Sequence, residues 1–348
     1  MTTENQSCES CSQEDQHKIQ DAEIRDRLNH IQNKLLVMSG KGGVGKSSVA
    51  AYLTVWLAER GHIVELMDVD LHGPSIPRLL GIQDGIKPGV QAGKAIPVAL
   101  MPNLLVMSIE SLMGEDKDVA TIWRGSLKIG VIRQFLSDME WSDLDYLIID
   151  SPPGTGDEPL TIAQTIPDAK AVIVTTPQEI SLADVRKSIN FCRQVNMVIM
   201  GLVENMGGFQ CPHCGELIEL FKARGGQQMA VKENLTLLAS LPIEPDVVSH
   251  GDTGRLAELK EKDIPFNRAF EQMIEKIENM TAGKKEERSE EPKKTTEGEL
   301  VMVDKTKFAV PVVEGKLCAH FGHCEHFALI QTEDGKIKDT SMQVPPAH

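Results

Sequence analysis

Short apolar runs alternate along the chain with segments whose apolar residues recur at helical spacing. Strands are predicted at residues 35–38, 63–67, 104–109, 144–150, 171–176 and 198–203, and residues 235–241 help to close the domain. Helices are predicted at 19–33, directly after residue 48, within 111–140 after a loop, at 182–195 and at 266–280. Strands that alternate with helices favour right-handed crossovers, so we expect an α/β fold: a mostly parallel sheet with helices on both faces.

The two ends of the chain differ from this pattern. Residues 1–18 are polar and lack apolar periodicity, which predicts a disordered tail. Residues 281–299 hold charges of both signs and almost nothing apolar, which predicts a linker between a main domain at 19–280 and a second piece at 300–348. Two strands are predicted in that piece, at 308–313 and 327–330. Because roughly 50 residues are marginal for an independent core, we expect it to be an incomplete domain.

The loop after the first predicted strand fits a phosphate-binding pattern, Gly40-x4-Gly45-Lys46-Ser47. Inward-turned backbone N–H groups would surround the phosphates of ATP, with the positive end of the next helix pointing at the same anion. Lys46 would reach the β- and γ-phosphates, and the Ser47 hydroxyl would hold Mg²⁺. The nucleotide-binding residues expected in this loop are Gly40, Gly42, Gly43, Val44, Gly45, Lys46, Ser47 and Ser48. A plain glycine turn is the simpler alternative, but the strand before the loop and the helix after it favour nucleotide binding.

Polar side chains follow three of the other predicted strands. Asp68 and Asp70 end the second strand, and Asp150 ends the strand at 144–150. The carboxyl ends of strands are where an open α/β sheet binds its ligands, and a buried strand closed by Asp is typical of the carboxylate that orients Mg²⁺. Gly154 could offer its N–H to the γ-phosphate, and the amide of Asn205 suits the edge of adenine.

Six of the seven cysteines occur in close pairs, which in a cytosolic chain indicates metal or redox chemistry. The gap between Cys211 and Cys214 lets both thiolates face one metal, but a four-ligand site needs two more. A two-fold dimer would supply them and give four thiolates for one iron–sulfur cluster. A zinc half-site, a redox dithiol and a mere turn remain alternatives.

The other cysteines are less informative. Cys8 and Cys11 are either an idle pair or an auxiliary iron–sulfur or zinc half-site. The Cys- and His-rich stretch 318–326 is either a metal site or a turn between strands. Cys192 lies within a predicted helix and is most simply a packed small side chain.

The charge balance argues against two classes of partner. A net charge of −15 disfavours nucleic acid and anionic membranes, and 4% aromatic content offers few stacking platforms. The N-terminus is polar and no apolar run reaches the roughly 18 residues of a membrane span. We therefore expect a cytoplasmic protein that binds neither nucleic acid nor membrane.

The loop carries a second lysine, Lys41, and in this it resembles the deviant Walker A motif of the SIMIBI-class ATPases, the group of MinD and nitrogenase iron protein. Further motifs narrow the likeness: Asp68-x-Asp70-x-x-Gly73-Pro74-Ser75, Trp123-Arg124-Gly125, Asp150-x-Pro152-Pro153-Gly154-Thr155-Gly156-Asp157 and Cys211-Pro212-His213-Cys214. Together they resemble the Mrp/ApbC family of ATP-dependent iron–sulfur cluster carriers over about residues 35–275.

The resemblance implies a P-loop NTPase fold and a role for each matching residue. Lys41 would stabilise the transition state at the partner's nucleotide across a dimer interface, and Asp70 would position or activate the attacking water. Asp68 and Asp150 would support Mg²⁺, while Cys211 and Cys214 would share a bridging [4Fe–4S] cluster with the same pair of a second copy. The expected function is a homodimeric ATPase that carries this cluster to apo-proteins. The rivals are a MinD/ParA-like positioning ATPase with a zinc or empty cysteine pair, and a reductase similar to nitrogenase iron protein.

The sequence departs from the family in two places. Ser126 stands where relatives commonly have proline, and only Cys8 and Cys11 are present of the four cysteines found at the N-terminus of some eukaryotic relatives. The C-terminal piece resembles the start of the ribonuclease H-like domain that accumulates iron–molybdenum cofactor, through His320-Phe321-Gly322-His323. That likeness suggests binding of a heterometal cluster.

Overall fold

The computed structural model describes residues 20–70, 73, 75–82, 87–88, 95–108, 125–138, 143–211, 213–221, 225–282, 305–313, 316–317, 326–333 and 336–343. The chain divides into two compact units, residues 1–289 and 290–348. The division falls inside the predicted linker 281–299. Each unit is described by itself.

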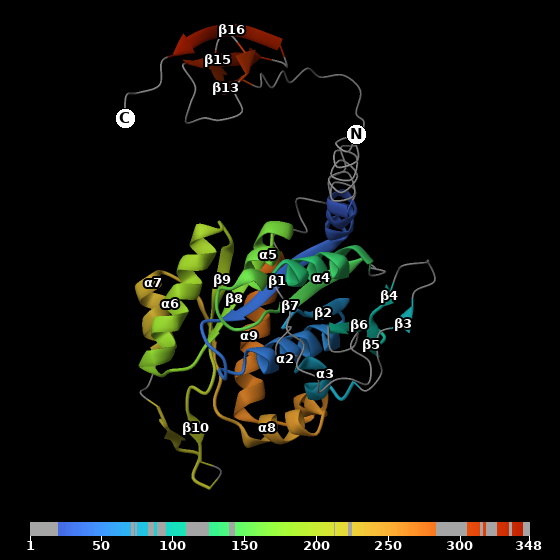
Figure 1. Ribbon diagram of the computed structural model, residues 1–348. Coiled ribbons are helices and arrows are strands. Elements are labelled where there is room, and N and C mark those ends of the chain that lie inside the picture. The colour runs from blue at the N-terminus through green and yellow to red at the C-terminus, as the bar shows by residue number, and fades with distance from the viewer. Residues whose placement is uncertain are drawn as a thin grey trace, which may run out of the picture. The chain divides into compact units, whose positions relative to one another are not determined.

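The larger unit is built on an eight-stranded sheet, and every pairing in it is parallel except that of the edge strand β5 (Figure 1). Across the sheet the strands are β12 (Leu237–Ser240), β9 (Val198–Glu204), β8 (Lys170–Thr175), β1 (Ile31–Ser39), β7 (Leu144–Asp150), β2 (Val64–Asp68), β6 (Leu104–Ser108) and β5 (Val98–Met101). The central strands are apolar almost throughout because helices cover both of their faces. The expected mostly parallel α/β fold is thus confirmed.

Neighbouring side chains of β1 show how the two faces are covered. Leu35 and Val37 pack with the helices α2 (Lys46–Glu59) and α9 (Pro265–Ala282), whereas Leu36 and Met38 belong to the core on the opposite face. That second core is closed by α4 (Gly125–Asp138), α5 (Asp157–Thr165), α6 (Glu179–Gln194) and α7 (Gly225–Glu233). Alternation of side chains along a strand therefore feeds two separate cores.

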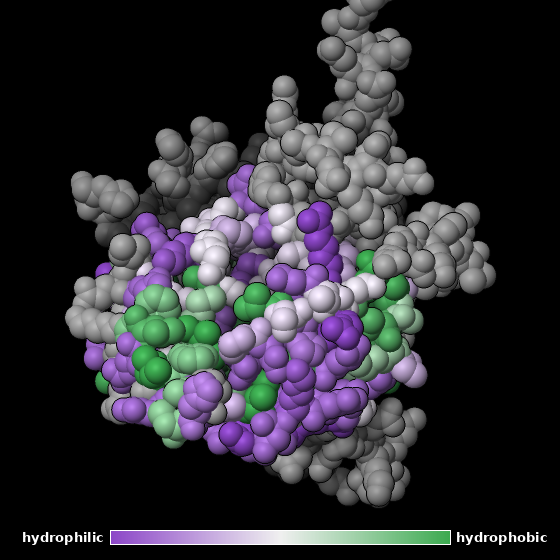
Figure 2. Space-filling model, turned by 90° about the horizontal axis from the view of Figure 1, so that it is seen from below, coloured by the Kyte–Doolittle hydropathy of each residue, from purple (hydrophilic) through white to green (hydrophobic). Residues whose placement is uncertain are grey.

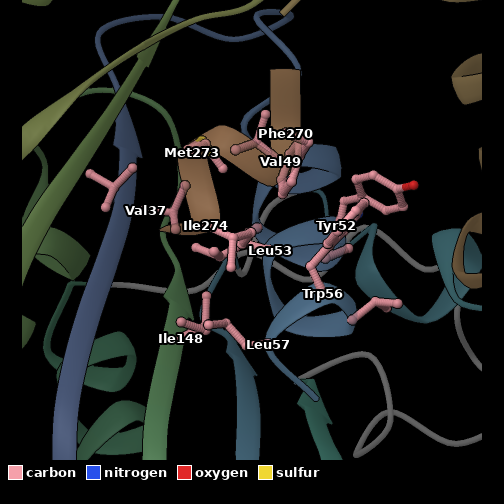
Figure 3. Packing of buried hydrophobic residues seen from close by; sticks show 14 of the residues in the cluster. Val37, Val49, Tyr52, Leu53, Trp56, Leu57, Ile148, Phe270, Met273 and Ile274 are labelled. Carbon is pink, nitrogen blue, oxygen red and sulfur yellow. The ribbon is translucent and has the colours of Figure 1, made fainter. Parts of the chain in front are cut away.

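Helix α2 is buried on nearly all sides, and aromatic rings fix it against α9 (Figure 3). The rings of Tyr52 and Phe270 meet edge to face with their centroids 4.8 Å apart, and Trp56 lies beside them. The buried Tyr52 hydroxyl donates to Asn267 Oδ1 at 2.5 Å. This contact joins the helix that follows the phosphate loop to the helix that ends the unit.

Smaller elements complete the larger unit. They are α3 (Ile76–Leu79), β3 (Lys87–Pro88), β4 (Ala95–Ile96), β10 (Phe209–Gln210), β11 (Leu217–Ile218), α8 (Pro245–Asp252) and the 3₁₀ helix η2 (Leu256–Glu261). Among the described residues, no helix combines the length and the apolar character that a membrane span requires.

The structure differs from the sequence-based expectation at the start of the first domain. A single helix was expected at 19–33, but the helix ends at residue 29 and β1 already begins at Ile31. The start of this strand is not an apolar run, because it contains the polar residues Gln32 and Asn33. The Gln32 side chain donates to Asp145 Oδ1 on β7, and the Asn33 side chain donates to the Asp145 carbonyl oxygen. Of the helical region expected at 111–140, the described part is α4.

The smaller unit has an antiparallel sheet with the strand order β14-β13-β15-β16. Its strands are β13 (Lys305–Val313), β14 (Lys316–Leu317), β15 (His326–Glu333) and β16 (Lys336–Gln343). Both expected strands are present and longer than predicted, whereas the polar β16 was not anticipated. The described part of this unit holds strands and no helix, so its resemblance to a ribonuclease H-like domain stays a prediction.

Candidate functional site

The phosphate-binding loop joins β1 to α2 at the carboxyl edge of the sheet (Figure 1). Gly43 and Gly45 take positive φ angles of 77° and 80°, which suit glycine because it has no Cβ. A Cβ on Gly40 would lie 2.3 Å from the backbone carbon of Asp184 in α6, so the loop begins pressed against that helix. The strand–loop–helix context predicted from the sequence is confirmed.

The loop encloses a cavity of about 290 Å³. Its lining consists of Ser39, Lys41, Gly42, Gly43, Val44, Gly45, Lys46, Ser47, Ser48, Asp70, Ser75, Leu79 and Pro153. All predicted loop residues except Gly40 therefore line one cavity, together with the predicted Asp70. Ser75, Leu79 and Pro153 were not assigned to the site from the sequence. Ser75 and Pro153 lie in motifs that carry the family resemblance, whereas no local signal marks Leu79.

Lys46 forms a buried ion pair at the base of this cavity. Its Nζ lies 2.5 Å from Asp150 Oδ1 and 3.0 Å from Ser47 Oγ, and the Asp150 side chain is fully buried. The second carboxylate oxygen of Asp150 is buried and has no hydrogen-bond partner among the residues that the structure describes. An unpartnered buried oxygen is costly, so this atom is suited to a cation or to a water held by one.

Asp68 lies beside Asp150 because β2 and β7 are paired in parallel with these two residues in register. Burial and the Asp150 charge raise the pKa of Asp68 well above its usual value, and burial also raises the pKa of Asp150 against the opposing effect of Lys46. Ser108 Oγ donates to Asp68 Oδ2 at 3.1 Å. Two carboxylates thus share one buried ammonium, and the site is short of positive charge.

The oxygen donors of this cluster fit Mg²⁺. Ser47, Asp68 and Asp150 offer hydroxyl and carboxylate oxygens, the ligands that this hard cation prefers. A divalent cation would also offset the excess of negative charge. The residues predicted to support Mg²⁺ are therefore chemically suited to it.

Asp70 and Lys41 line the cavity from two different segments of the chain. Asp70 is 8% exposed, its backbone N–H donates to Asp68 Oδ1 at 3.0 Å, and its own Oδ1 accepts from Gly73 N at 3.3 Å. Ser39 Oγ donates to the carbonyl oxygen of Lys41, which fixes the backbone where that lysine leaves the loop.

Gly154 and Asn205 are engaged within the protein rather than directed at open space. The Gly154 N–H donates to the Ser39 carbonyl oxygen at 2.8 Å. Asn205 Nδ2 donates to the Val44 carbonyl oxygen at 2.9 Å, and Asn205 Oδ1 accepts from Met206 N at 3.0 Å. The expected contacts of these two residues with γ-phosphate and adenine stay predictions, because each would have to exchange or share these bonds.

Cys211 and Cys214 lie in the turn of a short hairpin that joins β10 to β11 (Figure 1). Cys211 is partly exposed, Cys214 is exposed, and both are free thiols. The N–H groups of Cys214 and His213 lower the pKa of the Cys211 thiol, which favours the thiolate that binds metals. The described residues include no group of three or more potential metal ligands, so the expected four-thiolate site stays a prediction.

The face seen in Figure 2 is the lower side of Figure 1, where the label β10 lies. Separate apolar patches interrupt a mostly hydrophilic surface there. Near the cysteine hairpin, Ile218 and Leu220 are 43% and 54% exposed. The pair therefore lies in an accessible segment with apolar neighbours.

Cys192 has the structural role expected for it. It is fully buried in α6, its sulfur lies 3.5 Å from that of Met38, and burial raises its pKa to about 12. Several other predicted candidates lie outside the described residues: Cys8, Cys11, Trp123, Arg124, Cys318 and Cys324.

Comparisons with known proteins agree on the larger unit. The profile of a ParA family described as NUBPL iron-transfer P-loop NTPase matches residues 30–278. An iron-sulfur cluster carrier protein of Methanocaldococcus jannaschii is 41% identical over 268 residues, which cover 77% of this chain and 91% of that protein. A cytosolic Fe-S cluster assembly factor NUBP1 homolog of Caenorhabditis elegans is 43% identical over 73% of this chain and 83% of its own length.

Solved structures show the same fold. A nucleotide-binding protein of Archaeoglobus fulgidus in complex with ADP matches with a TM-score of 0.62 and 40% identity, over 72% of this chain and 96% of that one. The cell division ATPase MinD of Pyrococcus furiosus matches with a TM-score of 0.53 and 24% identity, over 72% and 99%. The second likeness extends to the fold alone.

Proposed function

Since the chain belongs to the NUBPL iron-transfer P-loop NTPase family, we propose that it is an ATPase that carries an iron–sulfur cluster on Cys211 and Cys214 and delivers it to apo-proteins. The observation that carries the proposal is that one unit holds both a nucleotide cavity and a cysteine pair. The phosphate cavity and an accessible cysteine pair, in which the pKa of the Cys211 thiol is lowered, both lie in residues 1–289.

ATP would bind with its phosphates in the 290 Å³ cavity. Lys46 would leave Asp150 to meet the β- and γ-phosphates, because a phosphate brings more negative charge than a single carboxylate. Ser47, Asp68 and Asp150 would then hold Mg²⁺. The ion would neutralise the negative charge that develops on the leaving phosphate.

Two side chains of the cavity would serve hydrolysis itself. Asp70 would orient the attacking water, since it lines the same cavity as Lys46 and Ser47. Lys41 would reach the nucleotide of a second copy and stabilise negative charge in the transition state. This role requires a dimer in which the two cavities face one another.

The same dimer would complete the cluster site. Cys211 and Cys214 supply two thiolates, and a [4Fe–4S] cargo needs about four. A second copy related by a two-fold axis supplies the other two from the same hairpin. Exposure of the hairpin suits a cargo that must leave for an apo-protein, whereas a reductase would need a cluster that stays bound.

We also infer a cytoplasmic protein, in keeping with relatives named as cytosolic assembly factors. The positioning-ATPase alternative has less support, because the likeness to MinD is one of fold. The sequence of this chain does not identify which apo-proteins accept the cluster.

Anaerobic reconstitution with iron and sulfide tests the proposal. We expect about four irons per dimer, with ultraviolet–visible and Mössbauer spectra of a [4Fe–4S] cluster. Cys211→Ser combined with Cys214→Ser should abolish iron binding and leave ATP binding intact, while Lys46→Ala should abolish ATP hydrolysis.

The matched control is Cys192→Ser, which alters a buried thiol of the same unit and should leave the cluster in place. Tightly bound zinc without iron would contradict the carrier function and favour the positioning ATPase. Full ATPase activity in Lys46→Ala would show that the cavity is not the nucleotide site.

A further inference from the structure

Asn205 connects the phosphate-binding loop to the segment that carries the cysteine pair. Its side chain is 9% exposed and uses both ends within the protein, donating to Val44 O and accepting from Met206 N. A Cβ on Gly45 would lie 2.3 Å from Asn205 Nδ2, so the amide rests on two consecutive loop residues. Any shift of the loop around a phosphate therefore acts directly on the Asn205 amide.

The chain from Asn205 to Cys211 has little freedom to absorb such a shift. Met206 takes a φ of 60°, an unusual conformation for a residue with a side chain, and its N–H is held by the Asn205 amide. Gly207 N donates to the Leu241 carbonyl oxygen at 2.8 Å, and Ile243 N donates to the Gly208 carbonyl oxygen at 2.5 Å. Each consecutive residue is thus fixed to a neighbour.

Glu204, next to Asn205, holds both ends of the cysteine-bearing segment. Its side chain is 2% exposed, and Oε2 accepts from the backbone N–H of Gly226, which follows the hairpin, at 2.5 Å. Oε1 accepts from Ser240 Oγ at 2.7 Å. A Cβ on Gly207 would lie 2.3 Å from that same Ser240 oxygen, so the segment entering the hairpin packs on the pair as well.

From these contacts we propose that Glu204 and Asn205 are positioning residues that couple nucleotide occupancy of the P-loop to the geometry and reactivity of Cys211 and Cys214. Asn205 senses the loop through Val44, and Glu204 fixes where the hairpin leaves and rejoins the domain. The inference rests on the proposed function to the extent that a nucleotide binds in the cavity. It adds the route by which that nucleotide reaches the cysteines.

Coupling of this kind is reciprocal. If a nucleotide changes the free energy of the hairpin's arrangements, a ligand on the cysteines must change nucleotide affinity by the same factor. For the effect to be large, the hairpin needs two arrangements of similar free energy. Only a few hydrogen bonds at Glu204 and Gly207 have to break for the hairpin to change its arrangement.

Thiol alkylation of the full chain without cluster tests the coupling. Rates at Cys211 and Cys214 are measured by peptide-resolved mass spectrometry after iodoacetamide treatment, without nucleotide, with Mg-ADP, and with a non-hydrolysable ATP analogue. Calorimetry on the same samples records nucleotide affinity. For the unaltered chain we expect nucleotide to change the alkylation rate by about fivefold or more, the lower end of typical coupling.

Glu204→Ala should bring the rates with and without nucleotide within about 1.5-fold of each other, with nucleotide affinity of the cluster-free protein unchanged, because coupling is lost while the cavity stays lined as before. Glu204→Gln should retain the effect, since its oxygen still accepts from Gly226 N while its amide donates to Ser240 Oγ. Exposed Glu261→Ala, the matched control, should behave as the unaltered chain.

If Glu204→Ala fails to fold by circular dichroism, Ser240→Ala decides instead, and it should reduce the nucleotide effect. Nucleotide binding that leaves both alkylation rates unchanged in the unaltered chain overturns the inference while the proposed function stands. A full nucleotide effect in folded Glu204→Ala also overturns it. Failure to bind nucleotide at all contradicts the proposed function and the inference together.

Discussion

Glu65 is a carboxylic acid buried within the eight-stranded sheet. It lies in β2, its side chain is fully buried, and neither carboxylate oxygen has a hydrogen-bond partner among the described residues. Burial raises its pKa from 4.5 to about 8. Asp150 bonds to Lys46 and Asp68 accepts from the backbone of Asp70, and both of these partners line the cavity. Glu65 is not among the described residues that line it, so its titration affects the free energy of unfolding rather than the nucleotide site.

The raised pKa of Glu65 predicts a loss of stability between pH 4.5 and 8. A group with a raised folded-state pKa contributes fully below its unfolded-state pKa, and that contribution is lost as pH rises through the folded-state value. Glu65→Gln removes the ionisation, so its free energy of unfolding should exceed that of the unaltered chain by about 4 kcal/mol at pH 8 and by little at pH 4.5. Urea unfolding at pH 4.5, 6 and 8 measures the difference.

Glu261→Gln serves as the control for this experiment, because it removes an exposed carboxylate and leaves the buried Glu65 in place. Asp68 and Asp150 also have raised pKa values, but they are present in all three proteins and cancel in the comparison. A constant difference between Glu65→Gln and the unaltered chain at every pH would show that Glu65 is ionised in the folded protein.

Among single residues, those of the phosphate loop could be predicted because the motif is contiguous and chemistry fixes its spacing. Asp68 and Asp150 could be predicted because each ends an apolar strand, and the parallel register then brings them together. The bond from Asn205 to Val44 and the bonds of Glu204 could not, since they join segments far apart in sequence. The sequence also carries no sign that Glu65 would be buried without a hydrogen-bond partner among the described residues.

At the scale of elements, α9 closes the face of the sheet on which α2 lies. Phe270 is fully buried and contacts the rings of Tyr52 and Trp56 in α2 (Figure 3). Phe270→Ala should lower the free energy of unfolding by about 3–5 kcal/mol, through lost burial and the cavity left behind. Thermal and urea unfolding measure this change.

Met280→Ala is the matched control on the same helix, since that side chain is 42% exposed and should cost little. Because α2 begins at the phosphate loop, Phe270→Ala should also weaken ATP binding, through a less rigid helix start. Equal stability of the two variants would show that α9 is dispensable for the core.

The elements that could be predicted are the long apolar ones. The central strands and the helices α2, α6 and α9 follow from runs and periodicity of apolar residues. Short elements such as β10, β11, α3 and α8 could not be predicted, because two to eight residues of mixed polarity carry too little pattern. The start of β1 was missed for the same reason, since Gln32 and Asn33 interrupt its apolar run.

At the scale of the whole molecule, both parts of the proposed activity belong to one unit. The cavity, the buried carboxylates and the hairpin of Cys211 and Cys214 all lie within residues 1–289. The family profile likewise covers 30–278. The second unit has its own sheet and pairs its strands among themselves.

A chain that ends at Ser289 should therefore bind ADP with the affinity of the full chain, within about twofold, because the whole nucleotide cavity belongs to residues 1–289. It should also take up the same amount of iron per dimer on reconstitution. Calorimetry and iron analysis on both chains measure these quantities.

A chain that ends before Pro265 is the control: it lacks α9, exposes the aromatic core beside α2, and should fail to fold. A tenfold loss of iron in the chain ending at Ser289, with ADP affinity kept, would assign part of the cluster site to the C-terminal unit. That outcome would favour Cys318 and Cys324 as ligands in place of a second copy's hairpin.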